Sequence, residues 1–280
     1  MSGGIRYCFN TSTVRGQELN IEEQVDLAGN AGYSGIEPWV QDIVQFRDSG
    51  GSLIDLKKRI DDHGLTVESG IGFANWIVDD EEERRQGLET ARHDMDLLRS
   101  LGGKRIAAPP AGAQNGPVLD LFDVIDRYRA LLEVGDACDV VPQLEVWGFS
   151  QNLHRLGHSV AVCVESNHPK ACLLPDVYHL FKGGSGFGGL DLLSDDAIQV
   201  FHMNDYPASP SREEMNDSHR VYPGDGIAPL NSILQSIAGN SRSVTLSLEL
   251  FNPDYWKLDA MEVATTGLKK MQDAVAAAGL

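Results

Sequence analysis

The sequence repeats one alternation from end to end. Short β-branched or apolar runs are followed, eight times, by longer segments whose apolar residues recur every three or four positions. This alternation is typical of parallel strands joined by crossover helices. No Gly-rich phosphate-binding turn follows the first strand, which favours a closed α/β barrel, the (β/α)8 or TIM barrel, over a doubly wound open sheet. Such a barrel needs about 250 residues. The 280 residues therefore predict a single domain over residues 1–280.

Element boundaries follow from the points at which the apolar period changes. Gly32, Gly64 and Gly102 stand where helices should end and give way to strands. Two long connections, 182–189 and 205–226, follow the sixth and seventh strands on the side of a barrel that carries active sites. The predicted strands are residues 5–11, 35–40, 66–72, 104–108, 143–148, 172–178, 198–204 and 244–250. The predicted helices are residues 21–31, 53–63, 81–101, 118–138, 153–166, 190–196, 229–238 and 259–278.

The net charge limits the partners of this chain. It has 23 basic and 41 acidic residues, a formal charge of −18, which repels nucleic acid and anionic membrane surfaces. No run approaches the roughly 18 apolar residues of a membrane span. The first residues lack a charged head followed by an apolar stretch, so we expect no leader peptide. The four cysteines form no CxxC pair. We therefore expect a cytoplasmic protein that acts on a small molecule and binds neither nucleic acid nor membranes, with homo-oligomerisation left open.

Four predicted strands in the second half end with a side chain that can bind a metal. They carry Glu145 in Leu-Glu-Val, Asp176 in Leu-Pro-Asp-Val, His202 in Phe-His-Met and Glu249 in Leu-Glu-Leu. Inward-pointing side chains at the C-terminal rim of a barrel converge on its axis, so these four can surround one ion. Each alone could be an ordinary rim residue. Together they would form a buried acidic cluster that is costly without a cation.

The ligand set indicates the kind of metal. Three carboxylates and one imidazole form an oxygen-rich site that suits one Mn²⁺, Mg²⁺ or Co²⁺ ion, and zinc ranks below these. Such an ion leaves coordination positions for substrate oxygens. The sequence therefore predicts one divalent metal ion as the cofactor.

Five segments together resemble a known family, the sugar phosphate isomerase/epimerase group of xylose-isomerase-like barrels. This group includes ketose 3-epimerases, hydroxypyruvate isomerase and keto-inositol dehydratase. The resemblance spans nearly the whole chain, and it is specific for the group but weak for any one activity in it. The segments are LEVWG at Glu145, LLPDVYHL with Asp176 and His179, VFHMND at His202, HRVYPGDG with Arg220, and LSLELF at Glu249.

The resemblance implies a role for each matched residue. Glu145, Asp176, His202 and Glu249 would hold the metal. Glu145 and Glu249 would also serve as acid and base on opposite faces of the substrate. His179 and Arg220 would bind the substrate, and a satisfied loop histidine is the alternative for His179 that ranks just below. Arg220 could hold a substrate hydroxyl, a phosphate or carboxylate, or a rim acid such as Asp217.

Chemistry gives an independent reason for such a set. A keto-sugar that chelates a metal through its carbonyl and adjacent hydroxyl has an acidified Cα–H, because the ion stabilises the enediolate. A neighbouring carboxylate can then take the proton. Delivery of a proton to the opposite face gives epimerisation, and delivery to the neighbouring carbon gives isomerisation. The leading prediction is therefore a divalent-metal-dependent isomerase or epimerase of a keto-sugar or related polyol-derived compound, with Glu145 and Glu249 as acid and base.

Two further residues near strand ends are candidate substrate contacts. Glu37, in Gly-Ile-Glu-Pro-Trp, can point into the barrel mouth or pair with a barrel arginine. Trp147 can stack on the apolar face of a sugar ring, as can other aromatic residues near strand ends. Core packing is the alternative role for each aromatic residue.

Three other functions compete with the isomerase. A metal-dependent lyase or dehydratase acting on a keto-inositol or a 3-keto-glycoside needs only a different leaving group. An endonuclease IV-like nuclease shares this barrel, but the −18 charge and the lack of further strand-end histidines disfavour it. A non-catalytic sugar-binding protein ranks with the nuclease below the first two. Substrate identity, including whether it is phosphorylated, is open, although neither long loop carries a cluster of Lys or Arg.

Overall fold

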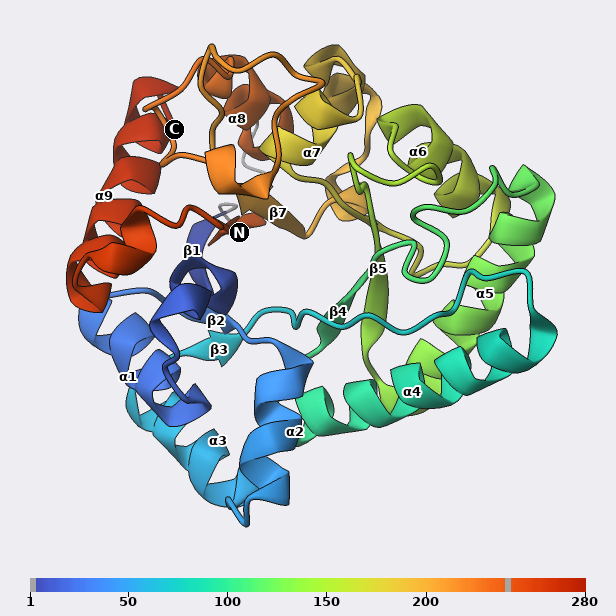
Figure 1. Ribbon diagram of the computed structural model, residues 1–280, viewed down its shortest axis with the longest axis horizontal. Coiled ribbons are helices and arrows are strands. Elements are labelled where there is room, and N and C mark those ends of the chain that lie inside the picture. Colours follow the sequence, from blue (N-terminus) through green and yellow to red (C-terminus); the bar gives the residue numbers. More distant parts are fainter. Residues whose placement is uncertain (1–3, 240–242) are drawn as a thin grey trace.

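The computed structural model describes residues 4–239 and 243–280. Within these residues the parallel strands form an inner ring and the helices an outer ring (Figure 1). The strands are β1 Ile5–Asn10, β2 Gly35–Glu37, β3 Thr66–Val67, β4 Arg105–Ala108, β5 Val141–Glu145, β6 Leu173–Leu174, β7 Val200–Met203 and β8 Val244–Leu248. The helices are α1 Ile21–Ala31, α2 Val40–Asp48, α3 Leu53–Asp62, α4 Glu81–Ser100, α5 Leu121–Cys138, α6 Leu156–Glu165, α7 Val177–Lys182, α8 Leu230–Ala238 and α9 Ala260–Ala277.

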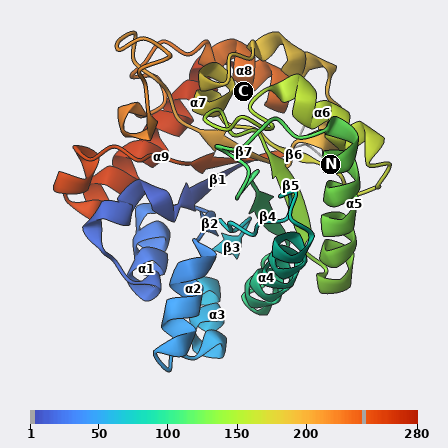
Figure 2. The same cartoon turned by 45° about the vertical axis from the view of Figure 1, so that its right-hand side comes forward.

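The strands close on themselves. Two ladders have the orders β3-β2-β1-β8-β7 and β4-β5-β6. A parallel bridge between Leu173 and Ile198 connects the ladders at β6 and β7, and the Ala107 amide donates to the Gly70 carbonyl at 2.8 Å where β4 meets the segment after β3. The outer ring closes as well, because α1 and α9 lie side by side, as both views show (Figure 2). The predicted closed barrel is therefore confirmed.

Alternation along β8 separates a polar face toward the barrel axis from an apolar face toward the helices. In and just after β8, Leu246, Leu248 and Leu250 belong to the main hydrophobic core, while the alternate residues Ser247 and Glu249 are buried polar groups. Successive side chains of a strand point to opposite faces, so the apolar set meets the helices and the polar set faces the barrel axis. A small apolar cluster of Ile71, Ala107, Leu174 and Val200 forms separately from the main core.

Most predicted elements agree with the structure, and the main differences lie in four parts. Helices α2 and α7 were not predicted. The predicted helix 190–196 is wrong, because this segment contains parts of two 3₁₀ turns, Phe187–Leu192 and Asp195–Ala197. The backbone is extended at Leu193 and Ser194, between these two turns, which interrupts the segment before a regular helix can form. The predicted strand 172–178 also ends early, since α7 begins at Val177.

The connection 205–226 is tied at its base by one carboxylate. Asp205 accepts backbone hydrogen bonds from Tyr206 and Ala228 at Oδ1 (2.8 and 2.9 Å) and from Gly224 and Gly226 at Oδ2 (3.0 and 3.1 Å). This fixes both ends of the loop relative to β7. Among the helices of residues 4–239 and 243–280, none is long and apolar enough to cross a membrane.

Candidate metal centre and active site

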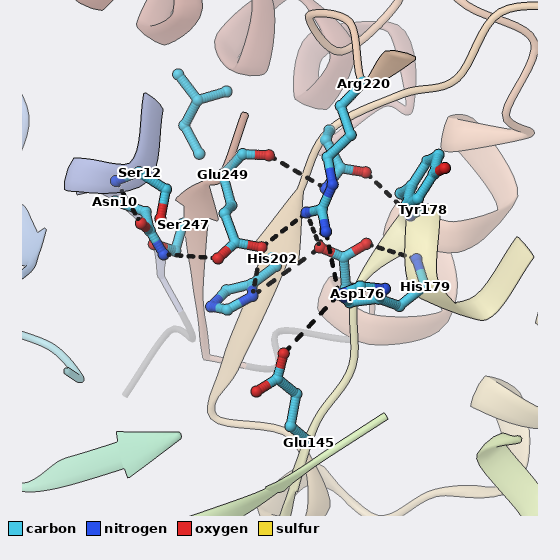
Figure 3. A network of polar contacts seen from close by, with 12 residues as sticks. Asn10, Ser12, Glu145, Asp176, Tyr178, His179, His202, Arg220, Ser247 and Glu249 are labelled. Atoms are coloured by element: carbon cyan, nitrogen blue, oxygen red, sulfur yellow. Dashed lines mark hydrogen bonds and ion pairs between the residues drawn. The ribbon is translucent and has the colours of Figure 1, made fainter. Parts of the chain in front are cut away.

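Three of the predicted ligands meet at the C-terminal ends of the strands. Asp176 follows β6, His202 lies in β7 and Glu249 follows β8, and one ligand atom from each lies within 4.8 Å of the others. A parallel bridge between Asp176 and His202 fixes two of them to each other. All three are buried. Figure 3 shows their side chains pointing toward one another.

Glu145 lies next to this group but does not belong to it. It is the last residue of β5, and its Oε1 atom lies 3.9 Å from His179 Nε2. Its carboxylate faces the histidines from below in Figure 3. The structure therefore places Glu145 apart from the compact group that the other three predicted ligands form.

His202 is held from two sides. Its Nε2 atom lies 3.0 Å from Glu37 Oε2, and its Nδ1 atom lies 3.2 Å from Glu249 Oε2 and 3.9 Å from Asp176 Oδ2. The imidazole is fully buried, and Nδ1 has no partner in hydrogen-bonding geometry. Nδ1 is thus the histidine nitrogen that faces the carboxylates of Asp176 and Glu249, while Nε2 faces Glu37.

Glu37 lies beneath the site and not in its mouth. Its side chain is fully buried, and Oε2 accepts from Ser247 Oγ at 2.6 Å and Asn10 Nδ2 at 3.0 Å in addition to contacting His202. No barrel arginine pairs with it among the described residues. These contacts are those of a residue that orients His202, a role that the sequence analysis did not assign to it.

Two asparagines complete the site and were missed by sequence reasoning. Asn10 Nδ2 lies 3.3 Å from Glu249 Oε1. Asn204 Nδ2 donates to Asp176 Oδ2 at 2.8 Å, and its Oδ1 accepts from the Tyr178 amide at 3.0 Å. Both lie at or just after the end of a strand, the same position that identified the acidic residues. Extending the search at strand ends to amides would have found them.

Arg220 fills the space between two of the acids. Its Nη1 atom donates to Asp176 Oδ2 at 2.9 Å and to Glu249 Oε2 at 2.7 Å. Nε and Nη2 donate to Asp217 Oδ1 at 2.9 and 2.6 Å, and Nη2 lies 3.0 Å from His179 Nε2. A guanidinium has five N–H donors, and these contacts engage all five. Of the partners left open for Arg220, the structure shows the rim acid Asp217.

The remaining predicted contacts lie around this centre. His179 is in the first turn of α7, where its amide donates to Asp176 Oδ1 at 2.7 Å. Trp147 is partly exposed, and its ring lies 6.4 Å from that of Phe73, which in turn lies 5.1 Å from that of Trp39. Phe73 is 45% exposed, so this aromatic row is accessible to a ligand.

Burial and neighbouring charges separate the pKa values of the two glutamates. Burial raises the pKa of Glu145 to about 8, helped by Glu249 and Asp176. Burial would also raise the pKa of Glu249, but the charges of His202 and Arg220 outweigh it and lower that pKa. The site thus contains one carboxyl that holds its proton near neutral pH and one that loses it readily.

The pKa values of the two histidines, His179 and His202, are also shifted in opposite directions. Burial would lower the pKa of His202, but Glu249 and Glu37 outweigh it and raise that pKa. Burial and Arg220 lower the pKa of His179 well below its usual value. His179 is therefore a neutral group, while His202 carries a proton that a metal would displace, since a metal ligand must be deprotonated.

The donor set fits a divalent cation. Two carboxylates and a histidine nitrogen that lacks a hydrogen-bond partner face one point in a buried site. Asp176, His202 and Glu249 could hold an ion there, with Glu145 beside them. Oxygen and imidazole ligands suit Mn²⁺, Mg²⁺, Co²⁺ and Zn²⁺.

Comparison with known proteins gives consistent matches. A family model described as xylose isomerase-like TIM barrel matches residues 25–274. An inosose isomerase from Bacillus velezensis is 26% identical over 280 residues, covering 97% of each chain. A 3-dehydroshikimate dehydratase from Pseudomonas putida is 19% identical over 252 residues, 90% of this chain and 39% of that protein. A crystal structure of IolI protein with a zinc atom has a TM-score of 0.88 and 23% identity, covering 97% of this chain and 98% of that one.

Proposed function

The chain belongs to the xylose isomerase-like TIM-barrel family, and on this premise we propose that it is a metal-dependent isomerase or epimerase of a keto-inositol or keto-sugar. The observation that carries the proposal is the buried group of Asp176, His202 and Glu249, with ligand atoms within 4.8 Å of one another. Relatives named inosose isomerase, aligned over 97% of this chain, favour a cyclic polyol ketone as the substrate class.

The proton transfers are assigned to the two glutamates. A bound divalent metal would supply stabilisation of negative charge on the substrate oxygens. Glu249, which is ionised beside His202 and Arg220, is the base that accepts the proton from the carbon next to the carbonyl. Glu145, whose pKa burial raises to about 8, is the acid that delivers its own proton to the opposite face or to the neighbouring carbon. Groups whose environments push their pKa values apart can divide these two roles.

The arginine of the site supports an uncharged substrate. In the metal-free site the N–H donors of Arg220 contact Asp176, Glu249, Asp217 and His179, so this arginine already has acidic partners and an uncharged substrate is favoured. The substrate is instead bound through its hydroxyl groups and by stacking on the aromatic row of Trp39, Phe73 and Trp147.

A lyase is the alternative, favoured by the relatives named 3-dehydroshikimate dehydratase. The same base can start an elimination if the substrate carries a leaving group β to the carbonyl. The two reactions differ in their products, because a lyase releases water or an aglycone and an isomerase releases nothing.

The deciding experiment follows solvent hydrogen in a set of keto-inositols and ketoses. The protein, loaded with Mn²⁺, Co²⁺, Mg²⁺ or Zn²⁺ in turn, is incubated with each compound in D₂O, and the products are followed by NMR. We expect deuterium to be incorporated next to the carbonyl, with no change in product mass other than that of the label. Glu145→Gln should lower the rate of deuterium incorporation by about 10²–10⁴-fold.

Glu68→Gln is the control for Glu145→Gln, because Glu68 is a buried acid of the barrel that pairs with Arg6 outside the site. It should keep the exchange rate. A product that has lost the mass of water would show that the protein is a lyase and would contradict the isomerase proposal. Absence of both reactions, together with no metal bound at micromolar concentration, would contradict the enzymatic proposal.

A further inference from the structure

Arg220 competes for the oxygens that would bind a metal. Its Nη1 atom contacts Asp176 Oδ2 and Glu249 Oε2 at 2.9 and 2.7 Å. The same two oxygens lie 3.9 and 3.2 Å from His202 Nδ1. The guanidinium therefore donates to the same two carboxylate oxygens that face His202 Nδ1.

The arginine is also anchored from the opposite side. Asp217 lies in a 3₁₀ turn, Asp217–His219, of the 205–226 connection, and its Oδ1 accepts from both Nε and Nη2 of Arg220. Arg220 is 1% exposed, whereas the Asp217 side chain is 40% exposed. A partly exposed acid at the rim thus pairs with a fully buried cation on the side away from the centre.

Building on the proposed metal site, we infer that Arg220 is an internal competitor that sets the affinity of this centre for divalent cations, and that Asp217 sets how strongly it competes. Arg220 acts here as a positioning residue.

Electrostatics gives the reason. Arginine stays charged under all ordinary conditions, and two like charges a few ångströms apart in a buried site repel each other strongly. A carboxylate oxygen that already accepts a charge-assisted hydrogen bond is also a weaker metal ligand. Both effects lower the affinity for a metal. The Asp217 carboxylate offsets part of the arginine charge and pulls the guanidinium toward the rim, which moderates both.

The inference predicts opposite signs for two variants. Arg220→Met removes the competing charge and should tighten Mn²⁺ binding by about tenfold or more. Asp217→Asn leaves Arg220 in place without its counter-charge and should weaken Mn²⁺ binding severalfold. In the double variant the effect of Asp217→Asn on Mn²⁺ affinity should shrink, because Asp217 acts through Arg220 and Arg220 is absent. Effects of residues that act through each other are not additive.

The measurement is isothermal titration with MnCl₂ on the full chain, first freed of metal by chelator and gel filtration. Circular dichroism and thermal unfolding with and without Mn²⁺ check each variant. Arg220→Met should unfold at a lower temperature than wild type without Mn²⁺, because two buried acids, Asp176 and Glu249, lose a counter-ion. Its unfolding temperature should rise more on addition of Mn²⁺.

A matched pair elsewhere in the barrel provides the controls. Arg127 has a side chain only 12% exposed and donates to Asp79 Oδ1 at 2.9 Å, away from the site on α5. Arg127→Met and Asp79→Asn should change stability without changing Mn²⁺ affinity. A general effect of removing a buried arginine would appear in these variants too.

The outcomes separate the inference from the proposed function. If wild type binds no Mn²⁺, Co²⁺ or Zn²⁺, the metal site itself fails. If wild type binds metal and Arg220→Met binds it equally or more weakly, only the role of Arg220 as a competitor is overturned. Should Arg220→Met not fold, Asp217→Asn alone decides, because unchanged or tighter binding in that variant contradicts the inference.

Discussion

Glu37 Oε2 lies 3.0 Å from His202 Nε2, and neither side chain is exposed to solvent. The carboxylate is itself fixed by hydrogen bonds from Ser247 and Asn10. It therefore determines which nitrogen of the histidine faces Asp176 and Glu249. Carboxylates that accept the second N–H of a metal-binding histidine set its ring orientation and raise its basicity.

Glu37→Gln is expected to weaken metal binding by about 10–100-fold, the usual cost of losing such a partner. The reason is that an amide is a weaker acceptor and can present its NH₂ group to the ring. Titration with Mn²⁺ measures the change, and Glu68→Gln is the matched buried control. An unchanged metal affinity combined with a higher KM would instead restore the earlier prediction that Glu37 contacts the substrate.

Addition of metal is expected to stabilise the protein. A ligand present at 100 times its Kd stabilises the folded state by about 2.7 kcal/mol, which corresponds to a rise in Tm of roughly 5–10 °C for a chain of this size. The rise should be lost in His202→Ala and should persist, reduced, in Glu145→Gln, because Glu145 lies outside the compact group. Thermal unfolding with Mn²⁺ and with EDTA gives the comparison. A larger loss in Glu145→Gln than in His202→Ala would show that the compact group is not the main ligand set.

Trp147→Ala is expected to raise KM about tenfold while kcat changes less. Its ring extends the row that includes Phe73, which is partly exposed, and loss of a stacking surface weakens ground-state and transition-state binding together. Steady-state kinetics with the substrate found by the deuterium screen measure both constants. Metal affinity should stay at the wild-type value, and a drop in that affinity would place Trp147 in the support of the metal site instead.

Asp94→Asn is expected to stabilise the protein at neutral pH. Asp94 in α4 is 9% exposed, burial raises its pKa, and its nearest basic group is His93 Nδ1 at 3.4 Å. Because the folded-state pKa is raised, the folded state binds the proton more tightly than the unfolded chain. Wild-type stability therefore falls as pH rises through that pKa.

The asparagine variant avoids this loss. Its Tm should exceed that of wild type by about 2–4 °C at pH 7.5, the equivalent of about 1 kcal/mol, and the difference should disappear as the pH approaches 4. Calorimetry at a series of pH values tests this, with the exposed Asp96→Asn on the same helix as control. A constant difference at all pH values would mean that titration of Asp94 is not its cause.

Periodicity in the sequence was sufficient for the barrel but not for its irregular parts. Long helices such as α4 and α9 have an apolar stripe that only one secondary structure satisfies. Helix α7 has six residues, too few for a stripe, and its signal is the cap, since the Asp176 side chain accepts from the His179 amide. A residue that seemed to end a strand was therefore also the start of a helix.

The candidate site was predictable to the extent that it depends on strand ends. Asp176, His202 and Glu249 are brought together by the barrel itself, because inward positions at one rim converge. The roles of Glu37 and Arg220 depend on which atom faces which, and this follows from the register of β2, β7 and β8 and from the course of the 205–226 connection. One sequence contains no direct signal for such contacts.

The clasp made by Asp205 makes the 205–226 connection modular. The Asp205 carboxylate accepts hydrogen bonds from four backbone amides near the two ends of the loop. These bonds hold the first and last residues of the loop in place. Residues 207–211 precede the carbonyls that Lys182 binds and the buried Met215, so this stretch could be exchanged for loops of other lengths while β7, Arg220 and the barrel rim keep their positions. A laboratory library, or natural divergence, could vary the loop residues at the rim of the active site. This would alter which compounds enter without changing the residues of the metal centre.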